Sequence, residues 1–167
     1  MKNHSLFSIL LVATLFVGFN SSCSKDDEDT SDACSSFPVL AGDMTVNGAK
    51  QRLSIAQFIV TSNFYNFQLA SVSDDCNEQK AINFSIQLAD GAKLNGTYTI
   101  KDFFSADINN ASGSILSQKV SPISQSSVDL ASGTIKVTEL GIKKYTIDVN
   151  ATDVLGEKII LSLTHQF

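Results

Sequence analysis

The chain has 167 residues, a formal net charge of −5 and 43% hydrophobic residues, and it contains no tryptophan. This length is enough for one domain with an apolar core and too short for two comfortable ones. The basic residues form no cluster along the sequence. Because a nucleic-acid site needs a positive stripe that follows the phosphates, no nucleic acid is expected among the partners.

The first 22 residues have the pattern of a secretory signal peptide. Lys2 provides a charged start, residues 6–19 form an apolar run, and two small residues precede Cys23. A membrane-spanning helix needs about 20 apolar residues, so the run is too short to span a bilayer. We therefore expect residues 1–22 to be removed from the mature protein.

Cys23 and the charged segment behind it carry a family resemblance. A cysteine at this position resembles the lipobox of bacterial lipoproteins. The acidic run resembles the export tag of Bacteroidota surface lipoproteins, and it comprises Lys25, Asp26, Asp27, Glu28 and Asp29. The resemblance implies a diacylglycerol on the Cys23 thiol and transport to the outer face of the outer membrane. It covers residues 1–32, about a fifth of the chain.

The resemblance departs from the family pattern at Asn20, where leucine is commoner. Cleavage by an ordinary signal peptidase, which would release a soluble protein, is the alternative. Residues 23–38 are expected to form a lipidated acidic tether, and residues 39–167 a single domain. From residue 33 onward the chain holds 12 acidic and 10 basic residues, so that domain is near neutral.

Two cysteines remain once Cys23 is assigned to lipid. Cys34 and Cys76 form an even pair in an exported protein, where disulfides persist. A bond between them would tie the start of the domain to a later loop and stabilise the fold by roughly 3–4 kcal/mol in the chain-entropy model. Two separate thiols, one of them buried, are the alternative.

From residue 44 onward, apolar residues alternate with polar ones, and no convincing helical period extends over more than three turns. The alternation predicts strands at 44–47, 53–60, 65–71, 82–88, 94–100, 114–120, 126–130, 135–137, 145–149 and 159–167. Nine or ten short strands at hairpin spacing indicate an all-β fold. Either an antiparallel β-sandwich or a lipocalin-like barrel fits this pattern.

Matching the apolar faces predicts a three-residue loop at residues 89–91 between two of these strands. Gly91 would take the left-handed third position that such loops favour. Phe84 would then lie opposite Gly96, a pairing that shields the weak spot left by a glycine in a sheet.

The same pattern predicts a second three-residue loop at residues 139–141. Gly141 would be left-handed there, and Ile135 would face Tyr145. Residues 106–127, rich in serine and asparagine, are expected to be mainly loop with one or two edge strands.

The residue inventory disfavours catalysis. His165 is the single histidine beyond the signal segment; it is expected at the edge of the core, and no G-x-S-x-G motif precedes it. Neither a metal nor a cofactor is expected, since soft zinc ligands and glycine-rich phosphate loops are missing. A glycoside hydrolase needs only two carboxylates. The candidates Asp90, Glu139 and Glu157 fall in turns, so a hydrolase ranks third among the hypotheses.

Aromatic side chains are the remaining candidates for ligand contact, namely Tyr65, Phe103 and Phe104. Neighbouring residues of a regular strand point to opposite faces, so one member of the Phe103–Phe104 pair is expected to be exposed. A twist or bulge that buries both is the alternative. The lack of tryptophan weakens the case for a sugar platform, because tryptophan gives the best stacking surface.

The leading hypothesis is a lipid-anchored surface protein of the outer membrane that binds or scaffolds without catalysis. Its expected partners are a nutrient-uptake complex, a glycan or a surface protein. The alternative is a lipocalin-like carrier of a small apolar ligand. A closed barrel with an apolar cavity of several hundred Å³ would favour the carrier, and a filled interior with an exposed aromatic loop would favour the binding module.

Overall fold

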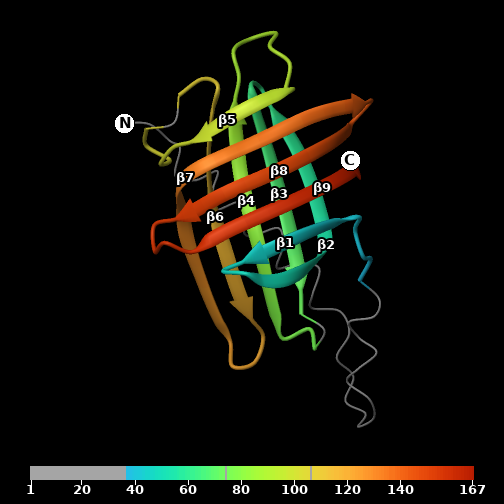
Figure 1. Ribbon diagram of the computed structural model, residues 1–167, viewed down its shortest axis with the longest axis vertical. Coiled ribbons are helices and arrows are strands. Elements are labelled where there is room, and N and C mark those ends of the chain that lie inside the picture. The colour runs from blue at the N-terminus through green and yellow to red at the C-terminus, as the bar shows by residue number, and fades with distance from the viewer. Residues whose placement is uncertain (1–36, 74, 106) are drawn as a thin grey trace.

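The computed structural model describes residues 37–73, 75–105 and 107–167, and this part of the chain forms a closed barrel of nine strands (Figure 1). The strands are β1 (Gly42–Val46), β2 (Ala49–Thr61), β3 (Phe64–Val72), β4 (Glu78–Gln87), β5 (Gly96–Ile100), β6 (Asn110–Lys119), β7 (Ser124–Gly141), β8 (Lys144–Asp153) and β9 (Lys158–Gln166). Their order around the barrel is β1-β2-β3-β4-β6-β5-β7-β8-β9, and β9 pairs with β1 to close it. The all-β prediction is confirmed, and the closed barrel is the observed alternative.

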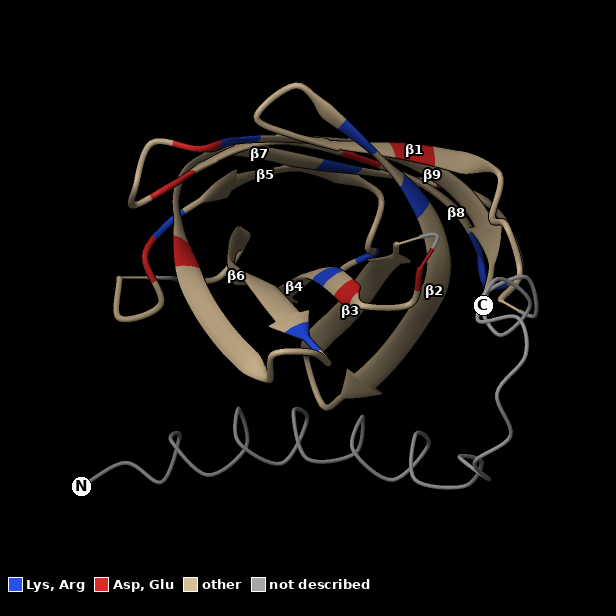
Figure 2. Cartoon of the chain, turned by 90° about the horizontal axis from the view of Figure 1, so that it is seen from below, with Lys and Arg blue, Asp and Glu red and all other residues tan. Residues whose placement is uncertain are grey.

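The barrel, seen from below in Figure 2, encloses the main apolar core, and a second small cluster of Ala70, Ala81 and Leu116 lies on β3, β4 and β6. Alternate residues of each strand point inward, as expected for a half-buried strand. The apolar faces predicted from the sequence are correct: Ile135 on β7, Ile147 on β8 and Leu161 on β9 are each exposed by no more than 1%. Burying a side chain of this size contributes roughly 1.5–3 kcal/mol, so the alternation fixes which face each strand turns inward.

The predicted pairing of β4 with β5 is wrong. β4 pairs with β3 and β6, whereas β5 lies between β6 and β7. Gly91 does adopt the expected left-handed conformation, with φ 75°. The chain that follows it does not return along β4, however, and β6 lies between β4 and β5. Phe84 lies opposite Gly113 of β6 and not opposite Gly96. Every strand of a barrel offers the same alternation to any neighbour, so matching faces cannot identify the partner.

The hairpin between β7 and β8 turns later than predicted. Ile135 pairs with Val149 rather than with Tyr145. Gly141 is the last residue of β7 and lies outside the left-handed region, which is occupied instead by Lys143 with φ 52°. The shift moves the pairing by an even number of residues. It therefore leaves every side chain on its predicted face. The alternation of apolar and polar residues is the same in both registers, so it could not distinguish them.

Residues 106–127 contain more strand than predicted, because β6 runs from residue 110 to 119 and β7 begins at Ser124. β7 is one strand of 18 residues where two were expected. Its first part pairs with β6 and its later part with β5 and β8. A register shift between Leu130 and Ser132 allows this change of partner, so the Ala-Ser-Gly segment marks a bulge and not a turn.

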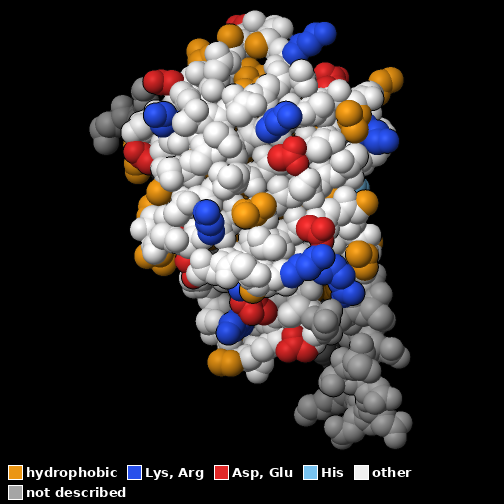
Figure 3. All heavy atoms as spheres, viewed as in Figure 1, with side chains coloured by type: hydrophobic (Ala, Val, Ile, Leu, Met, Phe, Trp, Pro, Cys, Tyr) orange, Lys and Arg blue, Asp and Glu red, His pale blue; other side chains and the backbone are white. Residues whose placement is uncertain are grey.

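The two ends of the barrel differ in their connections (Figure 1). We call one the aromatic end; it carries the β2–β3, β4–β5, β5–β6 and β7–β8 connections. We call the other the cysteine end; it carries the β3–β4 connection, with Cys76, and the β6–β7 connection. On the face shown in Figure 3, basic and acidic side chains are interspersed rather than gathered by sign. In the described part of the chain, no helix is long and apolar enough to cross a membrane.

Candidate functional site: the aromatic end of the barrel

Aromatic rings fill the interior near the aromatic end. Phe58 stacks on Phe67 with ring centroids 4.6 Å apart and meets Tyr145 at 5.5 Å and Phe167 at 5.6 Å. Phe67 stacks in turn on Phe84 at 4.9 Å. Rings at these separations are in contact. The space that an apolar ligand would need in a carrier is therefore occupied here by the protein's own side chains.

Tyr65, a predicted ligand contact, belongs to this interior cluster. It is partly buried on β3, packs against the core and stacks on Phe58 at 6.3 Å. Burial raises the pKa of Tyr98, and the charge of Tyr65 raises it further. Burial also raises the pKa of Tyr145, followed by the effects of Glu139 and Tyr65. Tyr65 thus sits close to two other tyrosines inside the barrel rather than on an exposed platform.

Phe103 and Phe104 lie outside the barrel, on the β5–β6 connection. Phe104 is 97% exposed and Phe103 is 50% exposed, and their rings meet edge to face at 5.8 Å. Neither sequence alternative anticipated this, since one buried partner or two were expected. β5 ends at Ile100, so the pair stands in a turn, where the alternation of a strand does not apply.

The turn that presents the two rings is held by Asp102. The Phe104 amide donates to Asp102 Oδ1 at 2.7 Å, and the Ser105 hydroxyl donates to Asp102 Oδ2 at 2.7 Å. The hydrogen bond from Ser105, then the one from Phe104, lowers the pKa of the Asp102 carboxyl. Sequence reasoning missed this residue. Aspartate favours turns because its side chain can accept a hydrogen bond from the backbone two residues further along, which is the contact that Asp102 makes with Phe104.

Ile108 extends the exposed apolar surface of the same connection and is 50% exposed. We call Phe103, Phe104 and Ile108 the apolar loop. Scattered apolar residues are common on protein surfaces and need no explanation. Two adjacent phenylalanines on a turn ordered by a carboxylate are different, because they offer a rigid aromatic contact with little conformational entropy left to lose on binding.

At the cysteine end, Cys76 is disulfide-bonded. The two other cysteines of the sequence, Cys23 and Cys34, lie outside the described residues, so the pairing with Cys34 stays a prediction. The surrounding loop is tightly hydrogen-bonded: the Ser73 hydroxyl donates to Asp75 Oδ1 at 2.6 Å and the Asn77 amide donates to it at 3.0 Å. These bonds, Ser73 first, lower the pKa of Asp75.

The predicted export tag, Lys25 to Asp29, also lies outside the described residues. The described chain begins beside an open groove of about 710 Å³ on the outside of the barrel, which brings Val39 and Leu40 together with Val72 and Ser73 at the end of β3. Lys50 and Asp43, with nitrogen and oxygen 3.0 Å apart, border the same groove; both are well exposed, so the pair contributes little. The groove places the start of the described chain near the cysteine end.

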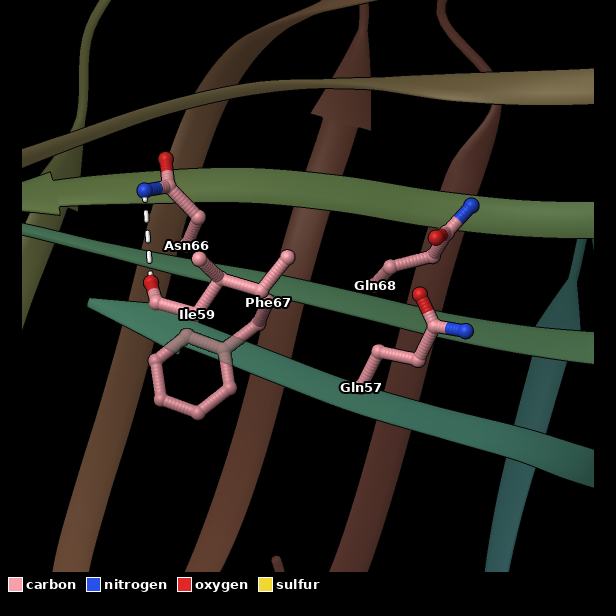
Figure 4. A pocket seen from close by; sticks show the side chains of 5 residues that line it. All are labelled: Gln57, Ile59, Asn66, Phe67 and Gln68. Atoms are coloured by element: carbon pink, nitrogen blue, oxygen red, sulfur yellow. Dashed lines mark hydrogen bonds between the residues drawn. The ribbon is translucent and has the colours of Figure 1, made fainter. Parts of the chain in front are cut away.

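A smaller depression lies on the outer wall of β2 and β3 (Figure 4). Its rim includes Gln57 and Gln68, which are paired across the two strands, and Asn66, whose side-chain amide donates to the Ile59 carbonyl at 3.3 Å. With a volume of about 10 Å³ it has room for about one water molecule. It is too small to hold an organic ligand.

Three further titratable side chains make contacts that stabilise the fold. His165 meets Phe167 edge to face at 4.9 Å and is partly buried, in line with its predicted place at the edge of the core. Asp153 accepts two backbone hydrogen bonds in the β8–β9 turn, at 2.8 and 2.9 Å. Glu157 accepts from the side chain of Asn47 at 3.0 Å. Within the described ranges, no group of three or more His, Cys, Asp or Glu side chains is arranged to hold a metal ion.

Neither a protein family, nor a curated protein, nor a solved structure matches the chain. Any functional conclusion therefore has to come from the residues and their geometry. The most distinctive feature of that geometry is the apolar loop, which stands out from a barrel whose interior is filled.

Proposed function

We propose that the protein is a lipid-anchored module on the outer surface of the outer membrane, which binds or scaffolds a partner without catalysis. The partner is a nutrient-uptake complex, a glycan or a surface protein. One observation carries the proposal: Phe103 and Phe104 are 50% and 97% exposed on a turn that Asp102 holds in place. Phenylalanine, like the other aromatic residues, is enriched in protein–protein interfaces relative to the rest of the protein surface.

The filled interior supports a binding module over a carrier. A lipocalin-like carrier needs an internal cavity of several hundred Å³. In this barrel, the ring of Phe58 contacts both Phe67 and Tyr145 in the region where such a cavity would open. A ligand of that kind would have to displace rings from the core. Contact through the outside of the barrel requires no such rearrangement.

The proposed localisation at the outer membrane is based on Cys23 and on the acidic run that follows it. An acyl chain supplies about 0.8 kcal/mol of membrane affinity per buried methylene, so a diacylated cysteine holds the protein firmly. The acidic tether between the anchor and the barrel would leave the apolar loop accessible to a partner outside the cell.

The binding role is tested by cross-linking on intact cells, followed by affinity recovery of the anchored protein. The informative variant is Phe103→Ala/Phe104→Ala. Loss of two aromatic contacts at about 1–2 kcal/mol each should reduce partner recovery by at least about tenfold. Ile142→Ala is the matched control, because Ile142 is 88% exposed on a different connection of the same end. Equal recovery with the double variant and the control would contradict the proposal.

A further inference from the structure

The β6–β7 connection at the cysteine end carries an exposed apolar tip. Ile123 is 91% exposed and Val120 is 63% exposed. Residues 120–128 contain no charged side chain, although the whole chain has a net charge of −5. We call residues 120–123 the apolar tip. Its composition, two aliphatic residues set among serine and proline, suits the boundary between lipid headgroups and acyl chains.

The apolar tip is fixed against the loop that holds the disulfide. The Val120 amide donates to the Asn77 carbonyl at 2.9 Å, and the Ser121 amide donates to Asn77 Oδ1 at 2.8 Å. Asn77 directly follows Cys76, which is disulfide-bonded. The tip and the covalent cross-link thus belong to one connected unit at this end of the barrel.

The N-terminal part of the chain is joined to this same end. The sequence offers only Cys23 and Cys34 as partners for Cys76, so either pairing ties a residue of the first 34 to the β3–β4 connection. Independently, Val39 and Leu40 line one groove with Val72 and Ser73. If Cys34 is the partner, the eleven residue steps back to Cys23 span at most about 40 Å when fully extended.

We infer that the cysteine end faces the membrane and that the apolar tip rests on the lipid surface, with the apolar loop pointing away from the cell. This orientation rests on the proposed lipid anchor at Cys23. A short tether attached at one end of the barrel keeps that end near the bilayer. The tether also holds the tip at a high effective concentration above the lipid, so a contact too weak to bind free protein is sufficient here.

The tip itself carries no charge. An anionic headgroup layer repels acidic surfaces and leaves neutral ones unaffected. Because residues 120–128 are uncharged, the tip adds no repulsion of its own, whereas Asp75 on the neighbouring β3–β4 connection is acidic and opposes close approach. The nearest basic side chain along the chain, Lys119, lies at the end of β6 beside the tip. It adds a favourable contact with anionic headgroups.

The absence of tryptophan from the chain makes a single introduced indole a clean reporter of depth. Protein beginning at Cys23, with its disulfide intact, is coupled through the Cys23 thiol to a maleimide lipid. The vesicles contain phosphatidylcholine and a minor fraction of phosphatidylglycerol, with and without brominated acyl chains. Ile123→Trp places the reporter on the apolar tip, and Ile142→Trp places a matched reporter at the aromatic end, on a residue of similar exposure.

The inference predicts that brominated lipid quenches the I123W variant at least about twofold and leaves I142W unchanged, because interfacial side chains lie within about 10 Å of the acyl chains. Quenching of I142W alone would show the inverted orientation. Equal quenching of both, or of neither, would show that the tip does not seat on lipid. Any of these three results overturns the inference. Chemical coupling supplies the anchor, so the outcome does not depend on lipidation of Cys23 in cells.

Discussion

At the scale of single residues, the buried Tyr98 makes the stability of the barrel depend on pH. Its hydroxyl donates to the Leu94 carbonyl at 2.8 Å, and burial raises its pKa above the ordinary value of 10.0. A raised folded pKa favours the protonated form. Its contribution to stability is therefore complete below pH 10.0 and is lost as the pH rises through the folded pKa. The free energy of unfolding should accordingly fall in alkali.

Tyr98→Phe tests this link. Removing the hydroxyl should cost about 1 kcal/mol at neutral pH, the usual net value of one hydrogen bond. It should also make the alkaline loss of stability smaller than in the wild type, because one titrating group is gone. Urea melts at neutral pH and above pH 10.0 provide the measurement. An alkaline loss as steep as that of the wild type would assign the effect to other groups.

Asp102 is a second residue whose role is local. Its pKa is lowered by the hydrogen bonds from Ser105 and Phe104, so the ordered turn should be fully present above the usual carboxyl pKa of 3.8 and should loosen as the pH falls through the lowered value. Asp102→Ala should speed hydrogen exchange at the Phe104 amide while leaving global stability close to that of the wild type. Unchanged exchange at that amide would show that the turn holds its shape without the carboxylate.

At the scale of elements, the close contact between β4 and β6 depends on a glycine. A Cβ on Gly113 would lie 2.8 Å from the Cβ of Phe84 and would also strike the Asn83 carbonyl oxygen, whereas a Cβ on Gly141 would meet nothing within 4 Å. Gly113→Ala should destabilise by about 1–3 kcal/mol through overpacking. Gly141→Ala should stay within about 0.5 kcal/mol of the wild type. Chemical denaturation ranks the two, and the reverse order would contradict the observed register.

The same elements show what the sequence could predict. Alternation correctly assigned the inward faces of β4, β5, β8, β9 and the later part of β7, because burial acts on each strand separately. It did not identify the neighbours of β5, since a strand inserted between β6 and β7 satisfies the same pattern as a hairpin. The Ala-Ser-Gly segment before Thr134 had the composition of a turn and proved to be a bulge within β7, because pairing with β8 on one side continues through it.

For the candidate site, the sequence located Phe103 and Phe104 but not their exposure. The predicted strand at 94–100 ended before them, as β5 does at Ile100, but the alternation of a regular strand was still applied to the pair. Asp102 was missed although an aspartate just past the end of a predicted strand favours a turn. The apolar tip was missed as well, because Ile123 stands isolated in a serine-rich segment and only the folded loop reveals its exposure.

At the scale of the whole molecule, the proposed localisation depends on two segments, the lipid anchor at Cys23 and the export tag. Mutations can test the two separately. Replacing Lys25 to Asp29 with alanine should keep the protein in the membrane fraction but turn it toward the periplasm, because Cys23 is untouched. Labelling of intact cells with an impermeant reagent measures the change. Surface labelling equal to that of the wild type would remove the export role of the acidic run.

Mass spectrometry of the protein extracted from membranes tests the proposal that the mature protein is a lipid-anchored barrel that begins at Cys23. We expect an N-terminal peptide that starts at Cys23 and carries the mass of a diacylglycerol on the thiol, with its affinity for the membrane supplied by those acyl chains. Cys23→Ser should abolish this species and leave either soluble protein or uncleaved precursor. An unmodified N-terminus at any other residue of the wild-type protein would contradict cleavage and lipidation at Cys23.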